Sequence, residues 1–174
     1  MMRRSIRLGL AIALSAAACA AMHAADEKLA LTSSAFGNGA IIPEQFTCKG
    51  ANVNPALYFH GIPLEAKALA LIVEDPDAPS GLFTHWIVWN IDPTINHVGE
   101  KSVPAGAAQG TNDFGNLGYG GPCPPSGTHR YIFRLFALDA PLDLKPGARR
   151  AALNQALTGH VLARSEMTAR FTAR

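Results

Sequence analysis

The chain has 174 residues, the length of one domain, with 48% hydrophobic and only 16% charged residues, so we expect a sizeable core. Its 16 glycines and 12 prolines indicate many turns between short elements and argue against a helical bundle. Without the three arginines of its N-terminal segment, the chain keeps 12 basic residues against 13 acidic ones, so nothing suggests an electrostatic nucleic-acid partner.

The first 25 residues have the layout of a secretory signal peptide. Three arginines precede an apolar run over residues 8–22, and a zone of small residues follows. The run is too short for a confident membrane span, which needs about 20 apolar residues. We therefore predict cleavage within residues 20–25, a single mature domain over residues 26–174, and a periplasmic or secreted protein. A membrane anchor and a twin-arginine export signal are the alternatives.

Hydrophobic patterns along the rest of the chain predict strands separated by turns. Short apolar runs bounded by Gly, Pro, Asn or Asp are typical of buried strands, and alternation of apolar and polar residues is typical of a half-exposed strand. Apolar residues at helical spacing between Pro146 and Gly159 predict one short helix. Because no βαβ alternation is present, we predict an antiparallel, mainly β fold. The expected strands are Leu29–Phe36, Lys67–Glu74, Thr84–Ile91, His129–Leu138 and Val161–Phe171.

Two aspartates follow the second of these strands, in the stretch Asp75-Pro76-Asp77-Ala78-Pro79. A residue that precedes a proline favours extended backbone, and residues two apart in an extended chain point to the same side. We therefore expect Asp75 and Asp77 to point together. Like charges at that spacing repel unless a cation, a histidine or a proton lies between them. A simple turn is the alternative.

His85 begins an apolar strand face that also carries Ile87, Trp89 and Ile91. A histidine in such a position is more often a core residue than a ligand.

A Gly- and Pro-rich loop over residues 105–128 leads into the next strand, and such a long loop in a compact domain is often functional. In that strand His129 and Tyr131 share one face, so both can line one cavity, whereas Arg130 points the other way.

Cys48 and Cys123 are the only cysteines left after removal of the predicted signal peptide. An oxidising compartment favours a disulfide between them. Two buried free thiols are the alternative.

Taken together, these motifs resemble the phosphatidylethanolamine-binding protein family, in its bacterial Raf-kinase-inhibitor-like branch. The resemblance covers nearly the whole mature chain, and the order of the motifs is its most specific feature. It implies a β-sandwich-like core of antiparallel sheets with few short helices. The motifs are Phe46-Thr47-Cys48, Asp75-Pro76-Asp77-Ala78-Pro79, His85-Trp86, Gly118-Tyr119-Gly120-Gly121-Pro122 and His129-Arg130-Tyr131.

The resemblance also implies a pocket that holds phosphate, acetate or phospholipid head-group analogues. A carboxylate beside a histidine raises the pKa of the imidazole, so two histidines held by the aspartates would present N–H donors to an anion. The tyrosine hydroxyl and the loop amides of Gly120 and Gly121 would add donors. The pocket residues implied in this way are Asp75, Asp77, His85, Gly120, Gly121, Pro122, His129 and Tyr131.

We therefore predict a binding protein for a small anionic or phosphorylated ligand, with no enzymatic activity and no cofactor. The resemblance further implies regulation or inhibition of a kinase or a protease. The eukaryotic relatives carry a C-terminal extension that helps to close the pocket, and we find none here, which argues against kinase regulation and phospholipid binding. The sequence leaves both a monomer and a homodimer open.

A metal-dependent hydrolase is the alternative, with Asp75, Asp77, His85 and His129 as ligands, since these residue types suit zinc. No H-E-x-x-H or G-x-S-x-G motif supports it.

Overall fold

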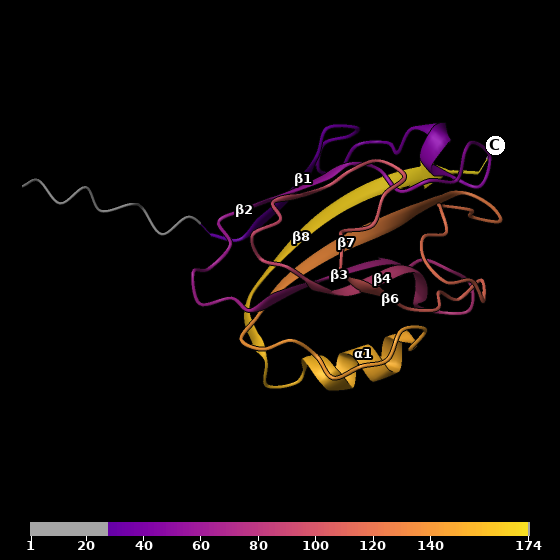
Figure 1. The fold of residues 1–174 in the computed structure, drawn as a ribbon. Helices are drawn as coiled ribbons and strands as arrows, with labels where there is room; N and C mark the ends of the chain where they lie inside the picture. The colour runs from indigo at the N-terminus through magenta and orange to yellow at the C-terminus, as the bar shows by residue number, and fades with distance from the viewer. Residues whose placement is uncertain (1–27, 174) are drawn as a thin grey trace, which may run out of the picture.

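The computed structural model describes residues 28–173, so the predicted signal peptide lies outside the described residues. The described chain forms three layers: a small sheet, a large sheet and a short helix (Figure 1). The small sheet has the strand order β1-β2-β5 and the large sheet the order β6-β4-β3-β7-β8, with every named pair antiparallel. The prediction of an antiparallel, mainly β fold with few short helices is confirmed.

The elements follow one another along the chain without any βαβ unit. They are β1 (Ala30–Ser33), the 3-10 helix η1 (Glu44–Phe46), β2 (Leu57–His60), β3 (Ala68–Asp75), β4 (Phe83–Ile91), β5 (His97–Val98), β6 (Ala108–Gln109), β7 (Thr128–Leu138), α1 (Arg150–Leu157) and β8 (Val161–Thr172).

Strand β1 is shorter than predicted because Ser33 ends it. Its hydroxyl donates to the carbonyl of Ala56 and accepts the amide hydrogen of Ala35, which bends the chain away from the sheet. Strands β2, β5 and β6 have only two to four residues each, too few for their patterns to predict a strand.

Both faces of the large sheet are covered. Phe133 and Leu135 of β7 pack toward the small sheet, whereas Leu138 packs toward Leu153 and Leu157 of α1. Fully burying one such side chain stabilises a fold by about 1.5–3 kcal/mol. All eight residues of β3 are buried, which explains why this strand reads as a continuous apolar run.

Strand β4 does not pair regularly with β3. Between the pairs formed by Trp86 and Thr84, β4 holds one residue more than β3, and this residue is His85. A β-bulge of this kind re-aims a side chain and is frequent beside functional sites. His85 accordingly packs against Tyr131 of β7, with the two ring centroids 5.1 Å apart.

The prediction that His85 shares a face with Ile87, Trp89 and Ile91 is therefore wrong. Ile87 and Trp89 pack on the α1 side of the sheet, whereas Ile91 packs between the two sheets. A second irregularity, at Asn90 with a φ of 56°, shifts Ile91 to the other face. Asparagine tolerates this left-handed conformation better than most residues.

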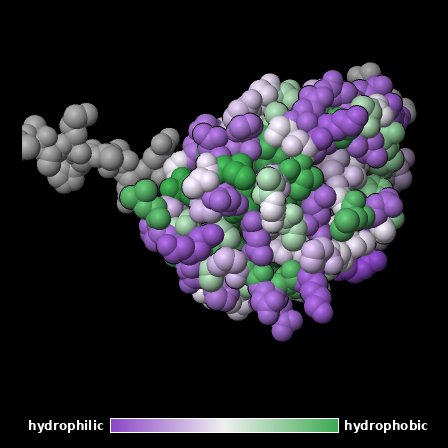
Figure 2. All heavy atoms as spheres, viewed as in Figure 1, coloured by the Kyte–Doolittle hydropathy of each residue, from purple (hydrophilic) through white to green (hydrophobic). Residues whose placement is uncertain are grey.

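The surface seen in Figure 2 shows hydrophobic side chains scattered among hydrophilic ones, without one dominant apolar patch. Within residues 28–173, no helix is long and apolar enough to cross a membrane.

Candidate functional site

A cavity of about 290 Å³ lies where β3, β4 and β7 meet the loop over residues 105–128. Its volume is at the lower end of the range for small-molecule sites, roughly 300–1,000 Å³. Three predicted site residues line it, together with two aromatic rings and several prolines. The lining residues are Asp75, Ala78, Pro79, Ser80, Phe83, His85, Phe114, Cys123, Pro124, Pro125 and His129.

Asp75 orients His129, as predicted. The imidazole Nδ1 donates to Asp75 Oδ2 over 2.7 Å, and both residues are buried. The other oxygen, Asp75 Oδ1, accepts the amide hydrogen of Asp77 at 2.8 Å. Both carboxylate oxygens are thus used inside the protein, so Asp75 fixes the imidazole and leaves Nε2 of His129 available to the cavity.

His85 is held differently, by a main-chain carbonyl. Its Nδ1 donates to the carbonyl oxygen of Gly120 over 2.6 Å. The rings of Phe83, Phe114 and Tyr131 surround it, with centroids 5.2, 5.4 and 5.1 Å from that of the imidazole. Burial in these surroundings lowers the pKa of His85, although the Gly120 carbonyl opposes the shift. The expectation of a raised histidine pKa is therefore wrong for His85, which is a neutral imidazole with its Nε2 lone pair free at neutral pH.

Asp77 is turned away from the cavity. Its carboxylate accepts from the amide, Nε and Nη2 of Arg130, over 2.9, 2.9 and 2.6 Å. Arg130 holds the pKa of Asp77 down at about 2. The prediction that Asp75 and Asp77 point together is wrong, because the hydrogen bond from the Asp77 amide to the Asp75 side chain closes a turn at this point. Arg130 stays outside the cavity lining, in line with the expectation that it points away.

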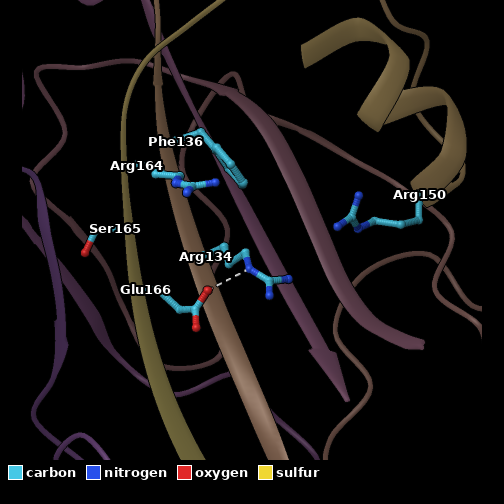
Figure 3. Close-up of a pocket in the computed structure, with 6 residues that line it drawn as sticks. All are labelled: Arg134, Phe136, Arg150, Arg164, Ser165 and Glu166. Carbon is cyan, nitrogen blue, oxygen red and sulfur yellow. Dashed lines mark hydrogen bonds and ion pairs between the residues drawn. The ribbon is translucent and has the colours of Figure 1, made fainter. Parts of the chain in front are cut away.

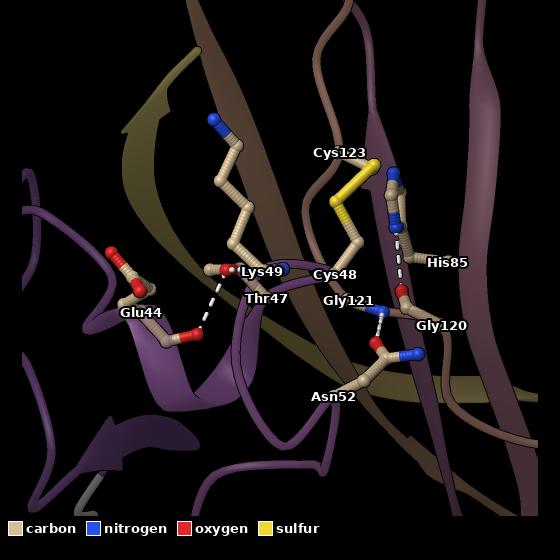
Figure 4. Close-up of a disulfide and its surroundings, with 9 residues drawn as sticks. All are labelled: Glu44, Thr47, Cys48, Lys49, Asn52, His85, Gly120, Gly121 and Cys123. Atoms are coloured by element: carbon tan, nitrogen blue, oxygen red, sulfur yellow. Dashed lines mark hydrogen bonds between the residues drawn. A yellow bond between two sulfur atoms is a disulfide. The ribbon is translucent and has the colours of Figure 1, made fainter. Parts of the chain in front are cut away.

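The two loop glycines do not offer their amides to a ligand. The Gly120 amide donates to the His85 carbonyl at 2.9 Å. The Gly121 amide donates to Asn52 Oδ1 at 2.7 Å (Figure 4). The expectation that they donate to an anion is therefore wrong. A side chain at Gly120 would collide with the ring of Phe114, so this glycine allows the loop to pack closely behind His85.

A disulfide joins Cys48 to Cys123, so the predicted pairing is confirmed. Figure 4 shows it beside His85, and Cys123 itself lines the cavity. The amide of Cys48 also donates to the carbonyl of Pro122 over 3.1 Å. The disulfide therefore ties the wall of the cavity to the chain segment after η1.

Tyr131 lies beneath the cavity and not on its surface. The residue is fully buried, and burial raises the pKa of its hydroxyl. It contacts His85 edge-on and so supports the imidazole from below.

The four residues of the hydrolase alternative do not gather as metal ligands. Asp77 is occupied by Arg130, and Asp75 uses both of its oxygens within the protein. In the part of the chain that the structure describes, no group of three or more His, Cys, Asp or Glu residues is placed to hold a metal ion.

The sequence analysis missed the apolar walls of the cavity. Phe83 and Phe114 pack edge to face, with centroids 4.7 Å apart, and Pro124 and Pro125 lie on the wall as well. Phe114 is 45% exposed although it is large and apolar. An aromatic residue in a Gly-rich loop was the available signal, but only the fold brings it beside Phe83.

Comparisons with known proteins find relatives of this chain. The family model described as "Phosphatidylethanolamine-binding protein" matches residues 32–172. A UPF0098 protein of Methanothermobacter thermautotrophicus is 49% identical over 142 residues, which cover 79% of this chain and 94% of that protein.

Two crystal structures are similar as well. A phosphatidylethanolamine-binding protein homologue from Chlamydia trachomatis has a TM-score of 0.81 and 40% identity, over 84% of this chain and 99% of that one. E. coli YbcL, described as a member of the mammalian family, has a TM-score of 0.80 and 30% identity, over 85% and 100% of the two chains.

Proposed function

Because the chain belongs to the phosphatidylethanolamine-binding protein family, we propose that it is a binding protein whose cavity at His85 and His129 holds a small oxyanion such as a phosphate group. One observation carries the proposal. Each imidazole has its Nδ1 fixed by a buried acceptor, and both residues line the same cavity. The two Nε2 atoms are then available to a ligand, and Ser80 lies on the same cavity wall.

The protonation of the two histidines fits a phosphate group. Protonated imidazoles donate from Nε2 to phosphate oxygens, and such charge-assisted hydrogen bonds are stronger than neutral ones. A neutral His85 accepts instead, and the hydroxyl of a monoprotonated phosphate can donate to it. The rings of Phe83 and Phe114 offer an apolar surface to the group that carries the phosphate.

Calorimetric titration with inorganic phosphate and phenyl phosphate tests the proposal. His129→Ala and His85→Ala each remove one hydrogen-bond partner, so we expect binding to weaken roughly ten- to a hundredfold, or about 1.5–3 kcal/mol. His160→Ala is the matched control, because His160 also pairs with an aspartate, Asp139, over 2.8 Å, but at an exposed position outside the cavity. If both cavity variants bind as tightly as the parent, the site is wrongly placed.

The same titration across pH adds a second readout. Binding through His85 should weaken as pH rises, because its imidazole loses the proton that it donates to the anion. The lowered pKa of His85 places its share of this change below pH 6.5. Affinity that is constant from pH 5 to pH 8 would argue against histidine donors.

The disulfide supports the further proposal that the protein works in an oxidising compartment, the periplasm or the exterior. N-terminal sequencing of the exported protein tests it, and a first residue within 21–26 is expected. Inhibition of a kinase or a protease stays a prediction, to be tested by recovery of a partner from that compartment.

A further inference from the structure

A second and larger cleft, of about 540 Å³, lies on the opposite face of the large sheet, beside α1 (Figure 3). Three arginines reach it from three different elements: β7, α1 and β8. Phe136 forms part of its wall, and Glu166 lies at its exposed side. The lining residues are Arg134, Phe136, Arg150, Arg164, Ser165 and Glu166.

The strand pattern explains how these side chains gather. Arg134 and Phe136 share the face of β7 that turns toward α1, and Arg164 and Glu166 share the matching face of the neighbouring strand β8. Ser165 points the other way, where its hydroxyl accepts the amide hydrogen of Leu31 over 3.1 Å. Figure 3 shows the guanidinium groups of Arg134 and Arg150 directed toward each other across the cleft.

The cleft holds more positive than negative charge. Glu74, only 1% exposed, is shared by Arg134 and Arg150, and Arg150 reaches its Oε2 with Nη2 over 2.9 Å. Glu166 pairs with Nε of Arg134 at 2.9 Å. Two carboxylates thus face three guanidinium groups. Burial and the charge of Arg134 lower the pKa of Arg150, as expected where positive charge is under-compensated.

Two sets of donors remain unused. Nη1 of Arg150 is buried and has no hydrogen-bond partner within residues 28–173. Arg164 forms no ion pair with any described residue and is exposed at the edge of the cleft. Buried polar groups in native proteins are almost always satisfied, so an unsatisfied guanidinium nitrogen in a cleft points to an absent acceptor.

We infer that this cleft is a second ligand site, for a small organic molecule that carries a carboxylate or a phosphate next to an apolar group. Guanidinium groups recognise both oxyanions through paired N–H donors. The apolar group would lie against Phe136. The volume of the cleft is in the usual range for small-molecule sites. Because arginines remain charged, binding of a carboxylate here does not depend on pH between about 5.5 and 8, in contrast to binding through His85.

Residue-resolved NMR titration of the full mature chain tests this inference. The probes are benzoate, phenyl phosphate and inorganic phosphate. We expect saturable shifts in the amides of residues 134–136 and 164–166 and in the arginine Nε–H signals. Saturation by benzoate assigns the site to carboxylates, and saturation by phenyl phosphate alone assigns it to phosphate esters. Shifts at residues 85 and 129 report the histidine cavity separately, so either site can fail without the other.

Arg164→Gln is the decisive variant, because this side chain has no partner to lose. We expect about tenfold weaker binding at the cleft, the loss of one charge-assisted hydrogen bond. Arg149→Gln is the matched control: it is an exposed arginine next to α1 whose nearest acid, Asp113, is 3.9 Å away, and it should bind as the parent does. Arg150→Gln should weaken binding further, provided that a thermal melt shows it folded.

Two results overturn the inference. One is the absence of saturable shifts around residues 134–136 and 164–166 with all three probes. The other is Arg164→Gln binding benzoate or phenyl phosphate as tightly as the parent.

Discussion

Glu74 and Asp75 are consecutive residues at the end of β3, and they supply the buried carboxylates of two different sites. Asp75 turns to the histidine cavity and holds one imidazole, whereas Glu74 turns to the α1 side and holds two arginines. The two side chains are almost equally buried. The partner of Asp75 is an imidazole, whereas the partners of Glu74 are guanidinium groups with permanent charge. The pleat of one strand thus separates a site that contains His85, a histidine with a lowered pKa, from a site built on arginines.

The largest expected effect follows from removing the carboxylate of Glu74, which pairs with Arg134 and Arg150. Glu74→Gln takes the buried carboxylate away from two partly buried arginines, of which Arg134 keeps Glu166 as a second acid, and the free energy of unfolding should fall by about 3–5 kcal/mol. Urea denaturation at pH 7 measures it. Glu166→Gln is the matched control, because Glu166 contacts the same Arg134 from a half-exposed position and should cost less than about 1 kcal/mol. Asp75→Asn should cost less than Glu74→Gln, since an amide oxygen can still accept from His129. Equal losses for all three variants would remove the distinction between the two carboxylates.

The disulfide distinguishes the two sites in a second way. Replacing Cys48 and Cys123 together by serine should lower the free energy of unfolding by about 2–5 kcal/mol, because the unfolded chain regains the freedom of a loop that spans 75 residues. The variant should also bind phosphate more weakly at the histidine cavity, whose wall includes Cys123, but bind normally at the arginine cleft. Denaturation and the NMR titration measure the two effects. A variant that loses both sites equally would show that the disulfide supports the whole fold and not one wall.

The lowered pKa of His85 should make the stability of the folded protein depend on pH. Its pKa is lowered in the folded protein, so the unfolded chain takes up a proton below pH 6.5 that the folded chain refuses. Stability should therefore fall as pH drops below 6.5, by at most about 1.4 kcal/mol per pH unit, until the folded histidine is protonated as well. His85→Gln should remove this part of the slope, whereas His160→Gln should retain it. Denaturation midpoints between pH 7 and pH 4 decide the matter.

The smallest expected effect belongs to Asp77, an aspartate that does not enter either site. Its pKa of about 2 means that the bond to Arg130 stabilises the fold above pH 3.8 and is lost as pH falls through about 2. The pair is solvent-exposed, so Asp77→Asn should cost less than about 1 kcal/mol at pH 7. The gap between variant and parent should close as pH falls from 4 to 2. A loss of phosphate binding in Asp77→Asn would show that Asp77 contributes to the histidine cavity.

The sequence predicted the long elements well, because the burial of a strand or helix face imposes a pattern over many residues. The five predicted strands and the helix all exist, and the strand ends coincide with the predicted ones or differ by up to three residues. Strands β2, β5 and β6 were not predicted, because a hydrophobic pattern over two to four residues is too short to indicate a strand. The faces of β4 were wrong because the bulge at His85 and the turn of the backbone at Asn90 each interrupt the alternation.

The candidate site was predictable only in part. The resemblance predicted that Asp75 or Asp77 holds His129, and Asp75 does. It did not predict that the Gly120 carbonyl holds His85, and the 35 positions between these two residues leave no local pattern that could show it. The arginine cleft had no local signal at all. Glu74 and Arg150 lie 76 positions apart, and only the packing of α1 on the sheet brings them together.

The disulfide also determines how the chain behaves after a protease cuts it. Leu64 is fully exposed in the connection between β2 and β3, inside the loop that Cys48 and Cys123 close. Exposed connections are preferred sites of cleavage. One cut there leaves two polypeptides that remain covalently joined, with every strand still able to stay in its sheet. Such nicked molecules would migrate as one species on a non-reducing gel and separate into two fragments once a thiol is added.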